Sequence, residues 1–331
     1  MKILDTRSIY YDDINLISSY NPHIASRKDI PEEKWRIFVS PMPSVVGERF
    51  ALEALKLGLS VCLHRFSSID DNIKLFKTIY KEYPELADVK TGRKAGIDTR
   101  LWGSIGLNDN ERFKKLRKVG CNNFIIDTAN AYLRTVMDYA AEIDTLLSLD
   151  EKLMVGNVHT KSICDMWAAR LPGVYIRVGI GGGSGCETTS MTAVNRGQIT
   201  EISECAPKTE QDDYHILADG SISKPANAVK AFGAGAENVM LGGYFSYAEE
   251  AQNIIDGEYK FWGCASHYNQ EKYGSIRRHS EGRVLELDKT KIKPLKVLVD
   301  DLWGGISSGV SYAGYKSLSD FIGEGVFELK Q

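Results

Sequence analysis

One cysteine ends a glycine-rich loop and has the setting of a nucleophile. Residues 178–188 read Val-Gly-Ile-Gly-Gly-Gly-Ser-Gly-Cys-Glu-Thr, so Cys186 follows five closely spaced glycines and Thr188 comes two positions later. Glycine lets the backbone approach a ligand closely and adopt positive φ. Backbone N–H groups in such a loop favour the thiolate, the reactive form of cysteine. A space-filling thiol is the alternative, but a polar glycine loop is a poor core.

Two further glycine-containing turns have the composition of a phosphate site. Asp219-Gly220-Ser221 and Gly242-Gly243-Tyr244 each follow an apolar run, and Ser184 adds a hydroxyl from the cysteine loop. Backbone N–H groups in such turns bind phosphate, whereas the Asp219 carboxylate suits ribose hydroxyls. Plain tight turns are the alternative interpretation. The glycines of the cysteine loop do not match a dinucleotide-binding fingerprint, because no early strand–helix–strand unit surrounds them.

The elements that must position these residues alternate between strand and helix. Helical patterns cover 47–57, 69–83, 110–119 and 131–147, with Ser68 and Asn108 as expected N-caps. The strand-like runs are 37–42, 59–66, 101–106, 123–129, 153–158, 174–180, 215–221 and 238–245. Eight such repeats predict an α/β fold, a closed (β/α)8 TIM barrel, with a doubly wound open sheet as the rival. In a barrel the loops after the strands form the active site, and the unusual residues gather there.

Composition and cysteine usage limit the expected partners and the expected compartment of the protein. The 331 residues carry a net charge of −3 and are 43% hydrophobic, which argues against nucleic acid or a membrane as the main partner. Six scattered cysteines without paired spacing fit reduced thiols in the cytoplasm rather than disulfides or zinc. We expect one barrel domain over 1–331 with no inserted regulatory domain. We also expect a long loop over the barrel mouth from about 246 to 297, and a closing helix near 300–310.

Several motifs in order along the chain resemble the IMP dehydrogenase and GMP reductase family. The match rests on the cysteine loop, Gly-Gly-Gly-Ser-Gly-Cys-Glu-Thr at 181–188, together with motifs spread over almost the whole chain. These motifs are Tyr-Asp-Asp-Ile-Asn-Leu-Ile at 11–17, Ser-Arg at 26–27, Ile-Ile-Asp-Thr-Ala-Asn at 125–130, Val-Gly-Asn-Val at 155–158, Leu-Ala-Asp-Gly at 217–220, Lys-Ala-Phe-Gly-Ala-Gly-Ala at 230–236, Val-Met-Leu-Gly-Gly at 239–243 and Phe-Trp-Gly-Cys-Ala-Ser at 261–266.

The reductase branch is the closer match. Dehydrogenases of this family carry inserted regulatory domains and an Arg-Tyr pair on a mobile flap, and neither is visible in this sequence. Instead, Arg-His-Ser-Glu-Gly at 278–282 resembles the reductase segment that supplies a catalytic glutamate. The resemblance therefore implies reductive deamination of GMP to IMP and ammonia. NADPH is the implied cofactor, with NADH as an alternative, and the implied assembly is a homotetramer.

The resemblance also implies roles for individual residues. Cys186 attacks C2 of the purine, while Thr188 and Glu281 manage the protons of the departing amine. Asp219 holds the ribose, and Arg278 contacts the nucleotide from the segment over the mouth. The phosphate is surrounded by Ser184, Gly220, Ser221, Gly242, Gly243 and Ser266. The cofactor is assigned to Arg65, Asp127 and Asn157, and a potassium ion to backbone carbonyls of Gly181, Gly183 and Cys186.

The cysteine loop departs from the reductase pattern Gly-Pro-Gly-Ser-Val-Cys-Thr-Thr-Arg. The proline, the valine and the threonine after the cysteine are replaced by Gly182, Gly185 and Glu187. The final arginine is Thr189, and Arg65 and Ser221 stand where a lysine and a glycine are usual. Three alternatives therefore stay open. They are an IMP dehydrogenase, a reductase of a related purine nucleotide or deoxynucleotide, and a nucleotide-binding homologue without turnover.

Overall fold

Eight parallel strands close into a barrel, as the sequence predicts. The computed structural model describes residues 7–86, 100–209, 211–274 and 280–330. The barrel strands, each paired with the next and β9 with β2, are β2 (Ile37–Val39), β3 (Ser60–Leu63), β4 (Leu101–Ile105), β5 (Asn123–Ile126), β6 (Lys152–Val158), β7 (Val174–Val178), β8 (Tyr214–Asp219) and β9 (Asn238–Leu241). Several end earlier than predicted, because residues such as Gly242 leave the sheet to form the mouth loops.

Each barrel strand is buried on both faces, which explains the nearly continuous apolar runs. One set of side chains fills the barrel interior, where the Phe38 and Trp102 rings lie 5.9 Å apart and Tyr175 packs edge-on against Trp102. The other set, exemplified by Ile37 and Val39, faces the helices and joins the main hydrophobic core. A packed interior of this kind leaves only the loops at the strand ends free to bind ligands.

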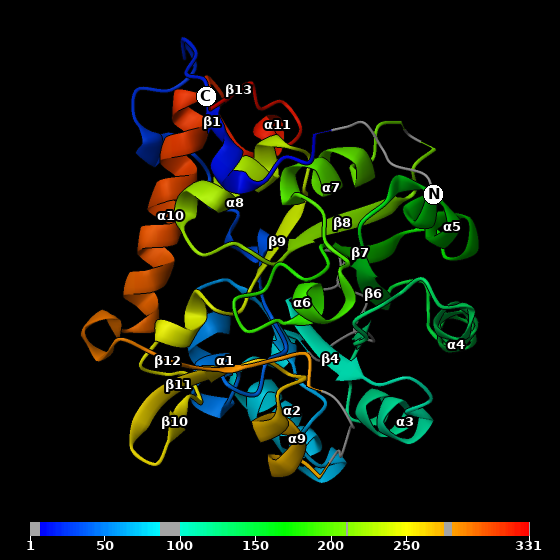
Figure 1. Cartoon of the computed structure of the whole chain (residues 1–331). Helices are drawn as coiled ribbons and strands as arrows, with labels where there is room; N and C mark the ends of the chain where they lie inside the picture. The colour runs from blue at the N-terminus through cyan, green and yellow to red at the C-terminus, as the bar shows by residue number, and fades with distance from the viewer. Residues whose placement is uncertain (1–6, 87–99, 210, 275–279, 331) are drawn as a thin grey trace.

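Helices surround the strands (Figure 1). They are α1 (Glu48–Lys56), α2 (Ile69–Glu82), α3 (Asn110–Lys118), α4 (Arg134–Asp144), α5 (Lys161–Arg170), α6 (Thr188–Thr192), α7 (Gln198–Cys205), α8 (Pro225–Gly233), α9 (His267–Lys272), α10 (Leu295–Tyr312) and α11 (Leu318–Phe321). The predicted N-cap Ser68 is confirmed, since its hydroxyl accepts the N–H of Asp71. The prediction for Asn108 is wrong: this residue lies in the preceding turn with φ of +58°, and Asp109 occupies the N-cap.

The segment expected as a long loop over the mouth contains regular structure. A small antiparallel sheet forms from β10 (Ile254–Ile255), β11 (Glu258–Trp262) and β12 (Val284–Glu286), with α9 between the last two strands. The closing helix α10 begins five residues earlier than predicted. Outside the barrel, β1 (Ile14–Leu16) pairs with β13 (Phe327–Leu329), so segments near the two ends of the chain lie side by side. Among the described helices, none has the length and apolarity needed to cross a membrane.

Candidate active site

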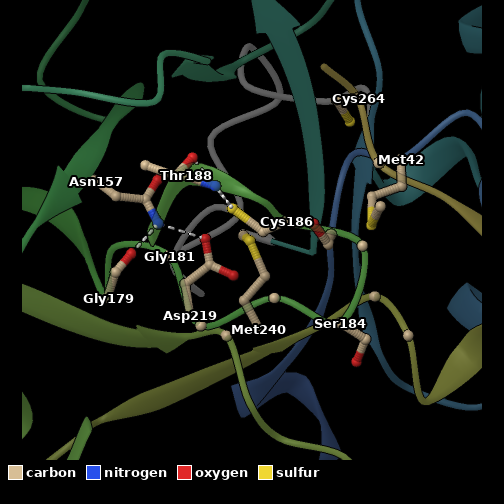
Figure 2. A pocket seen from close by; sticks show the side chains of 18 of the residues that line it. Met42, Asn157, Gly179, Gly181, Ser184, Cys186, Thr188, Asp219, Met240 and Cys264 are labelled. Carbon is tan, nitrogen blue, oxygen red and sulfur yellow. Dashed lines mark hydrogen bonds between the residues drawn. The ribbon is translucent and has the colours of Figure 1, made fainter. Parts of the chain in front are cut away.

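A cavity of about 500 Å³ opens at the ends of the barrel strands, where the sequence places the site. Its wall is the cysteine loop between β7 and α6, facing the turns after β8 and β9 (Figure 2). Most of the predicted site residues line it. They are Asp127, Asn157, Gly181, Gly183, Ser184, Cys186, Thr188, Asp219, Gly220, Ser221, Gly242, Gly243 and Glu281.

The three predicted catalytic side chains form a hydrogen-bonded chain. The Cys186 thiol lies 3.2 Å from the Thr188 hydroxyl, which in turn donates to Glu281 Oε2 at 2.9 Å. The backbone N–H of Thr188 also points to the sulfur, at 3.5 Å. A hydroxyl between a thiol and a carboxylate can pass a proton from one to the other. The chain therefore joins a nucleophile to a proton acceptor on the far side of the mouth.

Main-chain pairing holds Glu281 opposite the cysteine loop. Cys186 and Gly282 form an antiparallel bridge, in which the N–H of Glu187 donates to the Glu281 carbonyl at 2.7 Å. The N–H of Arg283 donates to the Gly185 carbonyl at 3.1 Å. The relative position of the thiol and the carboxylate is therefore set by backbone hydrogen bonds rather than by side-chain packing alone.

The close approach of the cysteine loop to the segment around Gly282 explains one departure from the family pattern, Gly185 in place of valine. A Cβ on Gly185 would lie 3.0 Å from the Phe261 ring and 3.1 Å from the backbone nitrogen of Gly263. A Cβ on Gly263 would overlap the Gly185 carbonyl, and one on Gly282 would lie 2.9 Å from the nitrogen of Ser266. Three segments thus meet at distances that only glycine permits, so a valine in place of Gly185 has no room here.

Two other departures, Gly182 and Ser221, fit each other. The Ser221 backbone is left-handed, with φ of +58°, and its hydroxyl donates to the Gly182 carbonyl at 2.6 Å. A Cβ on Gly182 would lie 2.8 Å from that hydroxyl and 2.7 Å from Nε2 of Gln198. The serine therefore fixes the glycine loop against the turn after β8, at the place where the sequence predicts phosphate.

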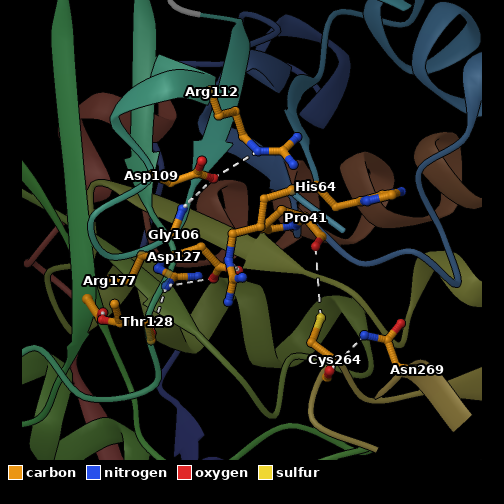
Figure 3. Close-up of polar contacts among 12 residues, drawn as sticks. Pro41, His64, Gly106, Asp109, Arg112, Asp127, Thr128, Arg177, Cys264 and Asn269 are labelled. Carbon is orange, nitrogen blue, oxygen red and sulfur yellow. Dashed lines mark hydrogen bonds and ion pairs between the residues drawn. The ribbon is translucent and has the colours of Figure 1, made fainter. Parts of the chain in front are cut away.

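A buried arginine, which the sequence analysis did not assign to the site, contacts two of the carboxylates that line the cavity. Arg177 on β7 is only 4% exposed and donates through Nη2 to Asp127 Oδ1 at 3.3 Å and to the Thr128 carbonyl at 3.1 Å (Figure 3). Its Nη1 lies 3.9 Å from Asp219 Oδ2, which also accepts Asn157 Nδ2 at 2.8 Å. A charge within an apolar strand, directly before a mouth loop, is the sequence signal that could have found it.

Burial and neighbouring charge shift the pKa of Asp219 in opposite directions. Burial raises the pKa of this carboxyl, while the Arg177 guanidinium and the Asn157 amide favour its ionised form. Arg177 thus stabilises two carboxylates that would otherwise repel each other.

Further residues that the prediction did not assign to the site are Met42, Met240 and Cys264, which also line the cavity. Burial raises the pKa of the Cys264 thiol to about 12, which disfavours its reactive thiolate form.

Two of the predicted site residues that the structure describes, Ser266 and Arg65, do not line the cavity. The Ser266 hydroxyl accepts the N–H of Asn269 and caps α9, and the residue is buried outside the cavity lining. Arg65 stands behind Asp127, with Nε 3.3 Å from Oδ2 of that carboxylate. Arg278 lies outside the described residues.

Two of the backbone carbonyls predicted to hold a cation accept hydrogen bonds from nearby residues of the same segment. The Gly183 carbonyl accepts the Cys186 N–H at 2.9 Å, and the Gly181 carbonyl accepts the Thr189 hydroxyl at 3.5 Å. These bonds close the loop into a compact turn. A carbonyl keeps a second lone pair, so the arrangement is compatible with a cation without requiring one.

A second buried carboxyl lies behind the loop. Glu201 on α7 is 1% exposed, and its carboxylate accepts the backbone N–H of Ile180, at the start of the glycine loop. Its Oε1 has no hydrogen-bond partner among the described residues. Burial raises the pKa of Glu201 to about 8, against the opposing effect of Arg196.

Comparison with known proteins agrees with this geometry. A family model described as IMP dehydrogenase / GMP reductase domain matches residues 11–330. GMP reductase of Caenorhabditis elegans is 30% identical over 273 residues, covering 78% of this chain and 75% of the relative. Human GMP reductase 1 is 30% identical over 295 residues, covering 86% and 80%. Inosine-5'-monophosphate dehydrogenase of Halobacterium salinarum is 31% identical over 241 residues, covering 69% and 48%.

Fold, cavity and relatives together define a purine-nucleotide oxidoreductase built on a (β/α)8 barrel. The chain belongs to the IMP dehydrogenase / GMP reductase family and is a GMP reductase-like enzyme.

Proposed function

We propose that this enzyme converts GMP to IMP and ammonia at the expense of NADPH, through a covalent bond between Cys186 and the purine. The observation that supports this proposal most strongly is the hydrogen-bonded chain from Cys186 through Thr188 to Glu281. A nucleophile, a proton relay and a carboxylate are the three groups that displacement of an amine from a purine requires.

The first half of the reaction replaces nitrogen by sulfur. The Cys186 thiol gives its proton to the Thr188–Glu281 pair as sulfur adds to C2 of the purine. The same pair returns a proton to the exocyclic nitrogen, so the C2–N bond breaks and ammonia leaves. The product of this half is a thioimidate between Cys186 and the purine. Proton transfer by a positioned group of this kind contributes about 10²- to 10⁴-fold to the rate.

In the second half, C2 receives a hydride and the sulfur–carbon bond breaks. A nicotinamide cofactor supplies that hydride when bound. The cavity has room beside the purine, because its wall continues from Cys186 to Asp127 and Asn157 on the opposite side. Asp127 and Asn157, with Arg65 behind them, would hold the cofactor.

The nucleotide would lie between the glycine turns. Asp219 would accept the ribose hydroxyls, and the backbone N–H groups of the turns at 220–221 and 242–243 would hold the phosphate with the Ser184 hydroxyl. A homotetramer, a cytoplasmic location, a potassium ion and a contact from Arg278 stay predictions of the sequence.

Absorbance of the nicotinamide at fixed enzyme concentration tests the proposal. We expect NADPH oxidation with GMP and no NAD reduction with IMP. Cys186→Ala should abolish turnover but still bind GMP, and Glu281→Gln should lower kcat by about 10²- to 10⁴-fold. Cys164→Ala, a thiol on α5 outside the cavity, is the control and should keep full activity. NAD reduction with IMP alone would make the enzyme a dehydrogenase. Silence in both assays, with GMP bound, would make it a nucleotide-binding protein.

A further inference from the structure

A second cavity of about 510 Å³ adjoins the phosphate end of the active site. The two cavities share three lining residues, Ser184, Gly243 and Phe261, so they meet at the turn that would hold the nucleotide phosphate. The second cavity then extends outward over the start of α10 and the small sheet that contains β12. It is as large as the catalytic cavity and has no part in the reaction derived above.

The junction between the cavities is narrow. A Cβ on Gly243 would lie 3.2 Å from the Ser184 hydroxyl and 3.8 Å from the Phe261 ring. A side chain at this position would therefore stand between the two cavities. With glycine at this position, the junction is lined by the Ser184 hydroxyl and the edge of the Phe261 ring.

Two lysines lie on the far side of the second cavity. Lys291 and Lys293 line it, and Asp301 is the only carboxylate among the lining residues that the structure describes. Each lysine has one carboxylate at 3.6 Å, Asp301 for Lys293 and Asp288 for Lys291. All four side chains are about half exposed or more, so both pairs are weak and solvent-screened. The hydroxyl-bearing side chains of Ser223 and Tyr247 also line the cavity.

A third cation, Arg283, lies near the junction, although it lines neither cavity. Arg283 donates through Nε and Nη2 to the Ser184 carbonyl, both at 3.2 Å. Within the described residues no carboxylate lies at ion-pair distance from its guanidinium. Apolar walls formed by Leu285, Leu287 and Leu298 strengthen the attraction of these cations for an anion.

We propose that the second cavity is a subsite for a further phosphate, so that the enzyme binds purine nucleoside 5'-diphosphates more tightly than monophosphates. This inference rests on the proposed function, which places the first phosphate at Ser184 and Gly243. The second phosphate extends past Gly243 into the second cavity and lies beside Lys291 and Lys293. Each exposed lysine contributes a few-fold in affinity, so the pair yields about tenfold.

Titration calorimetry of the full-length enzyme with GMP and with GDP tests this subsite. We expect GDP to bind about tenfold more tightly than GMP at low salt, with the difference shrinking as salt is added. Lys291→Ala/Lys293→Ala should reduce GDP affinity to that of GMP and leave GMP affinity unchanged. Asp301→Asn removes one of the competing carboxylates and should strengthen GDP binding further.

Lys289→Ala/Lys296→Ala is the matched control, since these neighbouring exposed lysines lose the same charge but line neither cavity. It should leave the preference for GDP intact. Equal or weaker binding of GDP than GMP would overturn the inference while leaving GMP reduction standing. A GDP preference that survives Lys291→Ala/Lys293→Ala would also overturn it. Absence of GMP binding would refute the proposed function and this subsite together.

Discussion

The buried carboxyl of Glu201 should make the protein less stable as pH rises. Its pKa is raised from 4.5 to about 8 by burial, so between these values the folded chain holds a proton that the unfolded chain has released. Stability from this group is complete below about pH 4.5 and is lost as pH rises through 8. The interval between these two pKa values, at about 1.4 kcal/mol per pH unit, sets an upper limit of about 5 kcal/mol. Water entry around the carboxylate lowers the cost, and we expect about 1–3 kcal/mol to be observed.

Glu201→Gln keeps the shape and the acceptor for Ile180 but removes the titration. The assay is the thermal midpoint by circular dichroism between pH 6 and 9, at one protein concentration. We expect the midpoint of the parent to fall over this range, while that of the variant stays flatter and exceeds the parent at pH 9. Glu324→Gln, an exposed carboxyl near the C-terminus, is the control and should follow the parent. A variant whose midpoint parallels the parent at every pH would refute the reasoning.

Three further changes can be measured against the same parent protein. In α10, Gly304→Ala should stabilise the folded protein by about 0.5–1 kcal/mol, because its Cβ would meet no neighbouring atom. Gly305→Ala should instead destabilise it by about 1–3 kcal/mol, because its Cβ would overlap Pro225. Chemical denaturation measures both changes in the free energy of unfolding. Arg177→Met should cost about 1–3 kcal/mol, since it removes the guanidinium that lies between Asp127 and Asp219 and leaves them only Arg65 and Asn157; a loss below about 0.5 kcal/mol would contradict the ion-pair geometry. Gly185→Val should lower kcat by about 10²-fold with near-normal nucleotide affinity, by separating the thiol from its relay.

The barrel was predictable because local patterns encode it. Eight apolar runs alternate with helical segments, and each run is buried on both faces, so periodicity alone places the strands and the mouth. Charged residues inside such runs are the exception: Arg177 was missed because a strand pattern does not show which side chains meet across the barrel. The family pattern supplied Glu281, although nothing local fixes its place opposite Cys186.

Contacts between distant segments account for the rest of what the sequence did not reveal. The small sheet of β10–β12 was expected as a loop, since its strands are short and are stabilised by one another. The fit of Gly185 against Gly263 joins segments almost eighty residues apart in the chain, and the pairing of β1 with β13 brings together segments near its two ends. Such pairings depend on tertiary structure, which spacing along one sequence does not report.

The backbone bridge between the cysteine loop and the segment around Gly282 makes the nucleophile and its proton acceptor one mechanical unit. Neither can move away from the other without breaking hydrogen bonds of the main chain. The amide hydrogens of Glu187, Gly263 and Arg283 should therefore exchange with solvent together, in one cooperative opening. Mutations elsewhere in the mouth can then alter how often the site opens, while each closure restores the same alignment of sulfur and carboxylate.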